Sequence, residues 1–454
     1  MISVSGIRGI VGAGLTPEIV THYAASFATW LGPGPIVFGR DSRPSGPALR
    51  HAVLAGLLGA GREVQELGIV PTPTVQLQVE HRHAAGGIAL TASHNPIEWN
   101  ALKLIGPSGR FLTKAEGESF LPMARDQGPR WAEWAGLGRV SEVPDPLALH
   151  LEKILALPWL DLPAIRKRKF RVALDAVHGA GGAIGRRLLM ELGCRADILF
   201  EEPTGLFPRP AEPLGENLGI LSAHVAAGMR SAEGAYDVGF AFDPDVDRLS
   251  LVDETGVPLG EECTLALCAR FVLERLPGPF VTNLSTSAMG EAVAAGLNRP
   301  ALRTPVGEAN VVEEIARSGA PIGGEGNGGV ILPAVHLGRD APVGVALILG
   351  LMAATGRTLS ELKSELPSLA MVKDKQEFVA VPALGPVGLA LQKGWPGATL
   401  DERDGIRLAL GHEWVHVRKS GTEPVVRIIA EAAGAARAEE LKNEAVRALR
   451  AAAG

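Results

Sequence analysis

The sequence predicts an α/β protein: three related α/β domains with mixed sheets, followed by a smaller C-terminal α+β domain. A chain of 454 residues is too long for one hydrophobic core and fits three or four domains of ~100–150 residues. Strand-like apolar runs alternate with helix-like stretches along most of the chain, which is typical of α/β layers. After about Pro367 the pattern changes to short strand candidates and a final helix, which is typical of an α+β domain with an antiparallel sheet.

The first domain is expected to span residues 1–146. Its strand candidates are residues 35–41, 63–68 and 87–91, and a helix candidate rich in Ala and Leu covers 46–61. The last of these strands runs directly into a polar loop. The stretch from 122 to 146, which contains Pro and Trp, weakens the pattern, so we expect it to be a linker.

The pattern of strand, glycine- or serine-containing turn and helix begins again at Arg171 and at Pro279. Three similar beginnings suggest related units and place the second and third domains at residues 147–254 and 255–366. The C-terminal domain then covers residues 367–454. Its strands are expected at residues 378–381, 405–410, 413–418 and 425–430, followed by a helix from Ala436.

The composition argues against several classes of protein. A formal net charge of -6 disfavours non-specific binding to nucleic acid or to an anionic membrane, because their phosphates would repel the chain. The 3 cysteines lack zinc-ligand spacing, and residues 1–8 do not read as a signal peptide. We therefore expect a cytoplasmic protein, a monomer or homodimer, without nucleic-acid or membrane partners.

Ser93 is the candidate nucleophile. It lies in the segment Thr91–Pro96 (TASHNP), directly after a strand candidate and among turn residues that continue neither a strand nor a helix. A nucleophilic hydroxyl needs exposure, a fixed loop and neighbours that stabilise developing charge. Lys103, on the strand-like stretch after the loop, supplies a cation or a proton-transfer group. The alternative is a surface turn with an incidental serine.

A second motif, DPDVDR, places Asp243, Asp245 and Asp247 at alternate positions before Arg248. In an extended segment alternate side chains face the same way, so the three carboxylates converge. A hard divalent cation relieves their repulsion, and oxygen ligands favour Mg²⁺ over zinc or copper. An EF-hand is disfavoured, because Arg248 stands where that loop needs its glycine. An acidic turn without a metal is the alternative.

Two further loops carry ligand-binding groups. The segment 418–424 (RKSGTEP), with Arg427 just beyond, offers hydroxyls, backbone N–H groups and guanidinium groups suited to a phosphate dianion. The segment 323–329 (GGEGNGG) offers one acidic and one amide side chain for sugar hydroxyls, and it matches neither a Walker A loop nor a dinucleotide fingerprint. For both loops the alternative is a solvated turn without function.

Taken in order, these motifs resemble those of the α-D-phosphohexomutase superfamily over nearly the whole chain. The resemblance implies that the four domains surround one central cleft. It implies an isomerase, an intramolecular phosphotransferase of carbohydrate metabolism that interconverts hexose 1-phosphate and 6-phosphate (phosphomannomutase/phosphoglucomutase). It also implies a phosphoserine, a bisphosphorylated sugar intermediate, one Mg²⁺ per chain and hexose 1,6-bisphosphate as activator.

The resemblance also implies roles for individual residues. The implied catalytic residues are Ser93, Arg8, Lys103, Arg248 and Glu308. The implied Mg²⁺ ligands are Ser93, Asp243, Asp245 and Asp247. The implied substrate-binding residues are His94, Glu325, Asn327, Arg418, Ser420, Gly421, Thr422 and Arg427.

The chain departs from the family pattern at three places. It opens with SGIRG at residues 5–9, where many members have TDGIRG. Glu308 stands where some members have an acid/base histidine, and the loop at 323–329 lacks the usual serine. This last departure falls where substrate identity is read, so phosphoglucosamine mutase is the alternative activity. A metal-dependent sugar phosphatase and a non-catalytic sugar-phosphate-binding protein are the alternatives from other classes.

Overall fold

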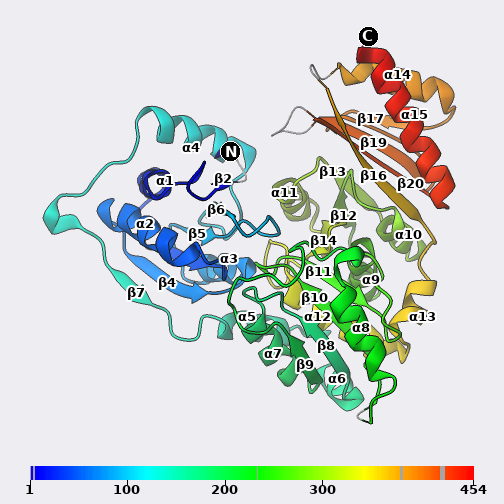
Figure 1. Cartoon of the computed structure of the whole chain (residues 1–454), viewed down its shortest axis with the longest axis horizontal. Coiled ribbons are helices and arrows are strands. Elements are labelled where there is room, and N and C mark those ends of the chain that lie inside the picture. Colours follow the sequence, from blue (N-terminus) through cyan, green and yellow to red (C-terminus); the bar gives the residue numbers. More distant parts are fainter. Residues whose placement is uncertain (1, 4–5, 233, 379–381, 420–424, 454) are drawn as a thin grey trace. The chain divides into compact units, whose positions relative to one another are not determined.

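The computed structural model of the chain (Figure 1) describes residues 2–3, 6–232, 234–378, 382–419 and 425–453. The chain divides into two compact units. The first unit comprises Met1–Thr264 and Gly328–Ser360, and the second comprises Leu265–Asn327 and Glu361–Gly454. The chain therefore leaves the first unit, forms part of the second, and returns to the first before its C-terminal portion.

The first unit begins with a seven-stranded mixed sheet in the order β1-β2-β6-β5-β3-β4-β7. Strands β5, β3, β4 and β7 pair in parallel, whereas β1, β2 and β6 join through antiparallel pairs. Helices α1 and α2 pack against each other, and α1 shares a hydrophobic core with α4 (Figure 1). The elements are β1 (Ile2–Ser3), β2 (Gly6–Ile10), α1 (Pro17–Trp30), β3 (Ile36–Arg40), α2 (Gly46–Gly59), β4 (Val64–Ile69), α3 (Thr72–His81), β5 (Gly86–Leu90), β6 (Trp99–Ile105), α4 (Lys114–Asp126), the 3-10 turn η1 (Trp134–Gly136) and β7 (Val140–Glu142).

The expected linker at 122–146 is partly structured. Helix α4 begins with a capping box between Thr113 and Glu116 and continues to Asp126, inside the expected linker. Strand β7 then adds an edge to the first sheet by pairing with β4. The three residues of β7 are all exposed and show no alternation of apolar and polar side chains. The strand therefore depends on its pairing with β4, and no sequence pattern predicts it.

A second mixed sheet in the first unit has the order β11-β10-β8-β9, with β10, β8 and β9 parallel and β11 antiparallel. Helix α12 is buried along almost its whole length and begins at the N-cap Asp340. No helix in the described part of the chain combines enough length and apolar character to cross a bilayer. The elements are α5 (Ala148–Leu155), α6 (Leu162–Arg168), β8 (Arg171–Asp175), α7 (Gly182–Glu191), β9 (Arg195–Leu199), η2 (Gly215–Asn217), α8 (Gly219–Gly228), β10 (Val238–Phe242), β11 (Leu249–Val252), β15 (Gly329–Ile331) and α12 (Ala341–Thr355), with α9 (Glu261–Leu273) and α13 (Leu359–Ser364) at the unit boundaries.

The second unit contains the parallel strands β13, β12 and β14 and a five-stranded antiparallel sheet in the order β16-β20-β19-β18-β17. Helices α14 and α15 cover one face of the antiparallel sheet and form its core (Figure 1). The elements are β12 (Phe280–Asn283), α10 (Met289–Gly296), β13 (Ala301–Thr304), α11 (Glu308–Ser318), β14 (Ile322–Glu325), β16 (Ala370–Glu377), α14 (Leu384–Gly394), β17 (Thr399–Asp401), β18 (Ile406–Leu410), β19 (Glu413–Lys419), β20 (Val425–Ala432) and α15 (Ala435–Ala453).

The first strand of this C-terminal sheet lies earlier than expected. The expected strand at 378–381 falls mostly on residues 379–381, which lie outside the described residues, and strand β16 ends at Glu377. Strand β16 alternates half-buried and exposed side chains, several of them charged, so its apolar face is too weak to identify from sequence. The strands near 406, 413 and 425 and the final helix lie where they were expected.

Candidate active site

The Ser93 loop is built at the carboxyl edge of the first sheet. Strands β3 and β5 are parallel neighbours, so the residues that follow them meet at one edge. Asp41, after β3, accepts hydrogen bonds from Thr91 Oγ1 at 2.6 Å and from Arg43 Nε at 3.1 Å. Thr91 Oγ1 in turn accepts from the Ser93 N–H at 2.9 Å. The start of the loop is therefore tied to the neighbouring strand by buried polar contacts.

Arg43, which is fully buried, holds the remainder of the loop. Its guanidinium donates to four backbone carbonyls, those of Ser93, Asn95 and Pro96 at 2.6 Å and of Trp99 at 3.0 Å. Asp41 balances its charge, so the buried cation and these carbonyls satisfy one another. The loop holds Ser93 at a φ of 51°, a left-handed conformation that an L-residue keeps only when its surroundings enforce it.

The three aspartates of the second motif are brought together in the same unit. Their carboxylate oxygens, one from each of Asp243, Asp245 and Asp247, all lie within 4.8 Å of one another. The expected extended segment is wrong, because the chain turns here and Val246 has a φ of 65°. The Asp243 Oδ1 atom accepts from the backbone N–H of Asp247 at 3.1 Å and from that of Arg248 at 3.3 Å, which stabilises the turn.

Ser93 lies directly on this carboxylate group. Its Oγ donates to Asp243 Oδ2 at 2.9 Å, although the two residues are 150 positions apart in the sequence. Ser93 is only 4% exposed, whereas we expected an exposed hydroxyl. The hydroxyl is buried because the loop folds against the aspartates. Nucleophile and metal-ligand candidates thus form one site.

Two cations and one hydroxyl compensate the buried carboxylates of Asp245 and Asp247. Lys103 Nζ lies 2.6 Å from Asp245 Oδ2 and 3.4 Å from Asp247 Oδ2, and Arg339 Nη2 donates to Asp247 Oδ2 at 2.6 Å. Thr72, at the start of α3, donates to the same oxygen of Asp245 at 2.6 Å. Asp245 and Asp247 thus each have their partners on one carboxylate oxygen, Oδ2.

These contacts set the protonation of the three carboxyls. Burial, reinforced by the charges of its two neighbours, raises the pKa of Asp243 well above its usual range. Burial would also raise the pKa of Asp245, but Lys103 overcomes this effect and brings it below its usual range. For Asp247, burial is likewise outweighed, mainly by Arg339, and its pKa is lowered. At least two anionic oxygen ligands are therefore available at neutral pH.

The donor set fits a divalent cation. Among the described residues, Asp245 Oδ1 and Asp247 Oδ1 are buried and have no hydrogen-bond partner. A buried carboxylate oxygen without a partner is costly, and a hard cation is the ligand that satisfies several such oxygens at once. The three aspartates could therefore hold a metal ion beside the Ser93 hydroxyl.

The other predicted residues of the first unit lie around this group. His94 Nδ1 is 3.3 Å from Ser93 Oγ, and burial together with the charge of Arg248 lowers the pKa of His94 to about 2, so its imidazole is neutral. Arg8 Nη1 donates to Asn95 Oδ1 at 2.9 Å. Arg248 Nη1 donates to Glu212 Oε1 at 2.9 Å. Every candidate from the first two motifs thus belongs to one cluster.

The sugar-loop candidates and Glu308 belong to the second unit. Glu325, at the end of β14, is buried and accepts from Asn283 Nδ2 at 2.9 Å. Asn327 is half-buried just beyond the strand, and Glu308 is the half-buried first residue of α11. The residues Ser420, Gly421 and Thr422 lie outside the described residues.

The phosphate-loop arginines belong to a row of cations across three strands. Arg418 on β19 is paired directly with Arg427 on β20, and Arg427 is paired with Lys375 on β16. Residues paired in this way lie on the same face of a sheet, and like charges directly opposite one another are destabilising. The Arg418 Nε atom lies 3.4 Å from Asp404 Oδ2. The row is suited to an anion.

Several residues of the site were not anticipated. The role of Arg43 in holding the serine loop appears only when β3 and β5 pair. Thr72, Glu212 and Arg339 lie outside every motif, and no sequence pattern marks them. Each contacts a motif residue that is 36 to 173 positions away.

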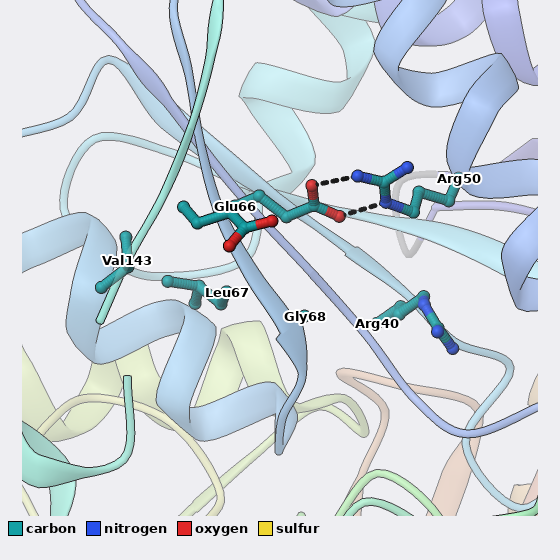
Figure 2. Close-up of a pocket in the computed structure, with 7 residues that line it drawn as sticks. Arg40, Arg50, Glu66, Leu67, Gly68 and Val143 are labelled. Atoms are coloured by element: carbon teal, nitrogen blue, oxygen red, sulfur yellow. Dashed lines mark hydrogen bonds and ion pairs between the residues drawn. The ribbon is translucent and has the colours of Figure 1, made fainter. Parts of the chain in front are cut away.

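The described part of the first unit contains cavities. One, of about 650 Å³, lies between the segment 94–98 and the segment 207–217 and includes His94 and Glu212. The other, of about 350 Å³, lies at the carboxyl ends of β3 and β4. Figure 2 shows that Arg50 and Glu66 pair with each other in this second cavity, while Arg40 lies apart from them. Of these two cavities, the first borders the serine loop.

Four family models match consecutive parts of the chain between residues 2 and 448. Models of phosphoglucomutase/phosphomannomutase match the α/β/α domains I, II and III at residues 2–120, 148–256 and 261–369, and the C-terminal domain at residues 371–448. The predicted fold class is therefore confirmed: three α/β/α domains with mixed sheets and a C-terminal domain with an antiparallel sheet.

Individual relatives cover nearly the full chain. A probable phosphoglucosamine mutase of Methanopyrus kandleri is 35% identical over 97% of this chain and 96% of its own. A phosphoglucomutase/phosphomannomutase of Thermococcus kodakarensis is 36% identical over 96% of this chain and 95% of its own. The structure of a phosphoglucomutase/phosphomannomutase family protein from Burkholderia thailandensis has a TM-score of 0.84 at 26% identity, covering 100% of this chain and 98% of that chain.

The fold and site define a phosphohexomutase, an isomerase of carbohydrate metabolism that moves a phosphoryl group within a sugar phosphate. The chain belongs to the phosphoglucomutase/phosphomannomutase family of the α-D-phosphohexomutase superfamily. Its relatives carry both phosphoglucosamine mutase and phosphoglucomutase/phosphomannomutase names, so family membership leaves the sugar open.

Proposed function

We propose that this enzyme interconverts hexose 1-phosphate and hexose 6-phosphate through a phosphorylated Ser93, with glucose and mannose phosphates as substrates. The observation that carries this proposal is the 2.9 Å hydrogen bond from Ser93 Oγ to Asp243, within a carboxylate group that has buried, unpartnered oxygens. A serine that only filled a turn would not need a nearby metal site. We also propose the four domains 1–146, 147–254, 255–366 and 367–454 as its functional parts.

In the proposed cycle, the free hydroxyl oxygen of a hexose monophosphate attacks the phosphorus of phosphorylated Ser93. The new P–O bond forms as the bond to Ser93 Oγ breaks, and the hydroxyl proton passes to a base, for which Glu308 is our candidate. The products are a hexose 1,6-bisphosphate and the Ser93 alkoxide. After the bisphosphate reorients, Ser93 Oγ attacks its other phosphorus, and the departing sugar oxygen takes the proton back from Glu308.

The residues of the first unit supply the charge that this transfer needs. Lys103, Arg8 and Arg248 present cations around the serine loop and offset the negative charge of the transferring phosphoryl group. Mg²⁺ held by Asp243, Asp245 and Asp247, with an oxygen of phosphorylated Ser93, would add charge neutralisation at the same group. Hexose 1,6-bisphosphate would serve as activator, because it can phosphorylate a bare serine.

In the second unit, we propose that Glu325 and Asn327 bind the sugar hydroxyls and that Arg418 and Arg427 bind the phosphate that is not transferred. The row of cations on the C-terminal sheet supports this assignment. Ser420, Gly421 and Thr422 are proposed for the same phosphate, and His94 is proposed to contact substrate beside Ser93. Phosphoglucosamine mutase is the second candidate activity, supported by the relative in Methanopyrus kandleri.

The test charges the enzyme with glucose 1,6-bisphosphate and Mg²⁺ and then supplies glucose, mannose or glucosamine phosphates. We expect intact-mass spectrometry to find one phosphoryl group on the wild-type protein and none on Ser93→Ala. We also expect Ser93→Ala to lose turnover by a factor on the order of 10⁴ or more. Ser141→Ala, at the exposed edge strand, should keep both. Release of inorganic phosphate without isomerised sugar would instead indicate a phosphatase, and turnover of glucosamine phosphate alone would reverse the substrate assignment.

A further inference from the structure

Glu212 contacts two residues of the serine site and lies outside every motif. Its Oε1 accepts a hydrogen bond from Arg248 Nη1 at 2.9 Å and lies 3.8 Å from His94 Nε2. The side chain of Glu212 is 37% exposed and that of Arg248 only 10%. Glu212 therefore lies at the border of the 650 Å³ cavity, and the largely buried Arg248 lies on its inner side, near Asp247.

A buried ion pair fixes the segment that carries Glu212. Arg209 Nε donates to Asp175 Oδ2 at 2.7 Å, and its Nη2 donates to the carbonyl of Phe242 at 2.9 Å. Asp175 ends β8 and Phe242 ends β10, which are parallel neighbours. Arg209 Nη1 also donates to the carbonyl of Pro210 at 3.0 Å. The glutamate is thus presented from an anchored segment, although that segment has no regular structure of its own.

Without Glu212, Arg248 would have another carboxylate within reach. Its Nε lies 3.7 Å from Asp247 Oδ1. In the described part of the chain, neither of these two buried atoms has a hydrogen-bond partner. A hydrogen bond requires a separation of about 3.2 Å or less, so a shift of about 0.5 Å would close the contact. A guanidinium on this oxygen would compete with a cation for it.

We propose that Glu212 is a positioning residue that holds the Arg248 guanidinium off Asp247, so that Asp247 Oδ1 remains available to the divalent cation. This inference rests on the proposed metal-dependent function. It assigns Glu212 no contact with substrate: the carboxylate acts through Arg248 alone. The arrangement keeps the Arg248 guanidinium close to the serine loop without letting it pair with the metal-ligand candidate Asp247.

Binding of Mn²⁺, used as a spectroscopic substitute for Mg²⁺, tests the proposal on the full-length dephosphorylated protein by electron paramagnetic resonance. In Glu212→Gln the Mn²⁺ Kd is expected to rise about tenfold, the low end of the range for residues that orient metal ligands. Glu216→Gln is the matched control, because this exposed glutamate lines the same cavity without a carboxylate contact to Arg248. Its Kd should equal that of the wild type.

A double-mutant cycle separates positioning from general damage. Arg248→Met removes the competing cation, so its Mn²⁺ Kd should be equal to or lower than that of the wild type, and adding Glu212→Gln to it should change nothing. A tenfold weaker Kd in Arg248→Met, an unchanged Kd in Glu212→Gln, or an equal loss in Glu216→Gln would each overturn the inference. The Arg248→Met result decides the matter even if Glu212→Gln does not fold. Wild-type protein that binds no Mn²⁺ would instead overturn the proposed function itself.

Discussion

Two residues at the heart of the site adopt left-handed backbone conformations, Ser93 with a φ of 51° and Val246 with a φ of 65°. Such conformations cost about 1–3 kcal/mol each in a residue other than glycine. Around Ser93, the buried guanidinium of Arg43 binds the carbonyls of the loop. The carbonyl of Val246 accepts a hydrogen bond from the backbone N–H of Ala341 at 3.2 Å. In both cases a residue distant in sequence offsets local strain.

Arg43→Lys tests how far one side chain holds the serine loop. An ammonium group cannot reach four carbonyls at once, so buried groups lose their partners and the free energy of unfolding should fall by about 3–5 kcal/mol. Phosphorylation of Ser93 should decrease in parallel. Urea unfolding and intact mass measure the two effects. Arg40→Lys, which alters a half-buried neighbour with one carbonyl contact, should cost about 1 kcal/mol. Equal losses in both variants would contradict this role.

At the scale of elements, the two faces of the C-terminal sheet differ in composition. Alternate residues of its strands form the core with α14 and α15. The other face carries the row Lys375, Arg427 and Arg418, together with Trp414 and its neighbour Arg407, whose guanidinium lies 4.9 Å from the Trp414 ring. Trp414 is buried on this face, so part of the face packs, whereas Arg427 and Lys375 are exposed and their charges are not explained by packing.

Lys375→Ala and Arg427→Ala should each raise the KM for hexose phosphate about tenfold, because one charge-assisted phosphate contact corresponds to roughly 1.4 kcal/mol. The unliganded variants should be a few tenths of a kcal/mol more stable, since the repulsion across the strands is relieved. Steady-state kinetics and urea unfolding measure both effects. Lys393→Ala, on the exposed side of α14, is the control and should leave KM unchanged. A wild-type KM in both row variants would exclude the row from binding.

The stability of the second unit should depend on pH through His416. This histidine is buried, its Nε2 lies 2.7 Å from the carbonyl of Asp404, and burial lowers its pKa to about 4. In the unfolded chain His416 has a pKa near 6.5, so it binds a proton at a higher pH than in the folded protein. The stability that is present above pH 6.5 is therefore lost as the pH falls toward 4. The loss should approach about 3 kcal/mol. His416→Gln should flatten this part of the urea-unfolding profile, and an unchanged slope would contradict the assignment.

At the scale of the whole molecule, the candidate site residues are divided between the two units. Ser93 and the three aspartates belong to the first unit, and Glu325, Asn327, Arg418 and Arg427 belong to the second. The chain returns to the first unit after Asn327 and brings Arg339 to Asp247. Asp340, next to it, is the N-cap of the buried helix α12 and accepts from His150 Nε2 at 2.7 Å. The aspartate site is thus built from separate parts of the sequence: the segment from Thr72 to Lys103, the aspartates themselves, and Arg339.

Mg²⁺ should stabilise the first unit, because the converging carboxylates exist only in the folded state. At a concentration one hundred times its Kd, the ion should add about 2.7 kcal/mol to the free energy of unfolding. Urea unfolding with Mg²⁺ and with EDTA measures the difference. Asp245→Asn should lose this increment, whereas Asp126→Asn, at an exposed helix end, should retain it. Identical curves with and without the ion would argue against a metal site.

Much of the architecture was predictable because it depends on local patterns. Strands β3, β5, β8 and β12 are buried apolar runs bounded by turns, and they lie where the sequence placed them. Strand β7 could not be predicted, because its three exposed residues pair only where β4 offers an edge. The turn at Asp243–Arg248 was misjudged as extended, since a left-handed valine has no sequence signature. The domain boundaries stay a prediction.

The sequence by itself determined the chemical groups of this protein: a serine in a proline-bounded loop, three closely spaced aspartates, and loops rich in glycine and arginine. Those choices are local and are visible in neighbouring residues. Only the tertiary structure decided which groups act together. Lys103 meets Asp245 across 142 positions, and Ser93 meets Asp243 across 150, because folding brings the first sheet and its serine loop onto the aspartate turn. The roles of Arg43, Arg339 and Glu212 can be inferred only from the folded structure, because the residues that they contact lie far away in the sequence.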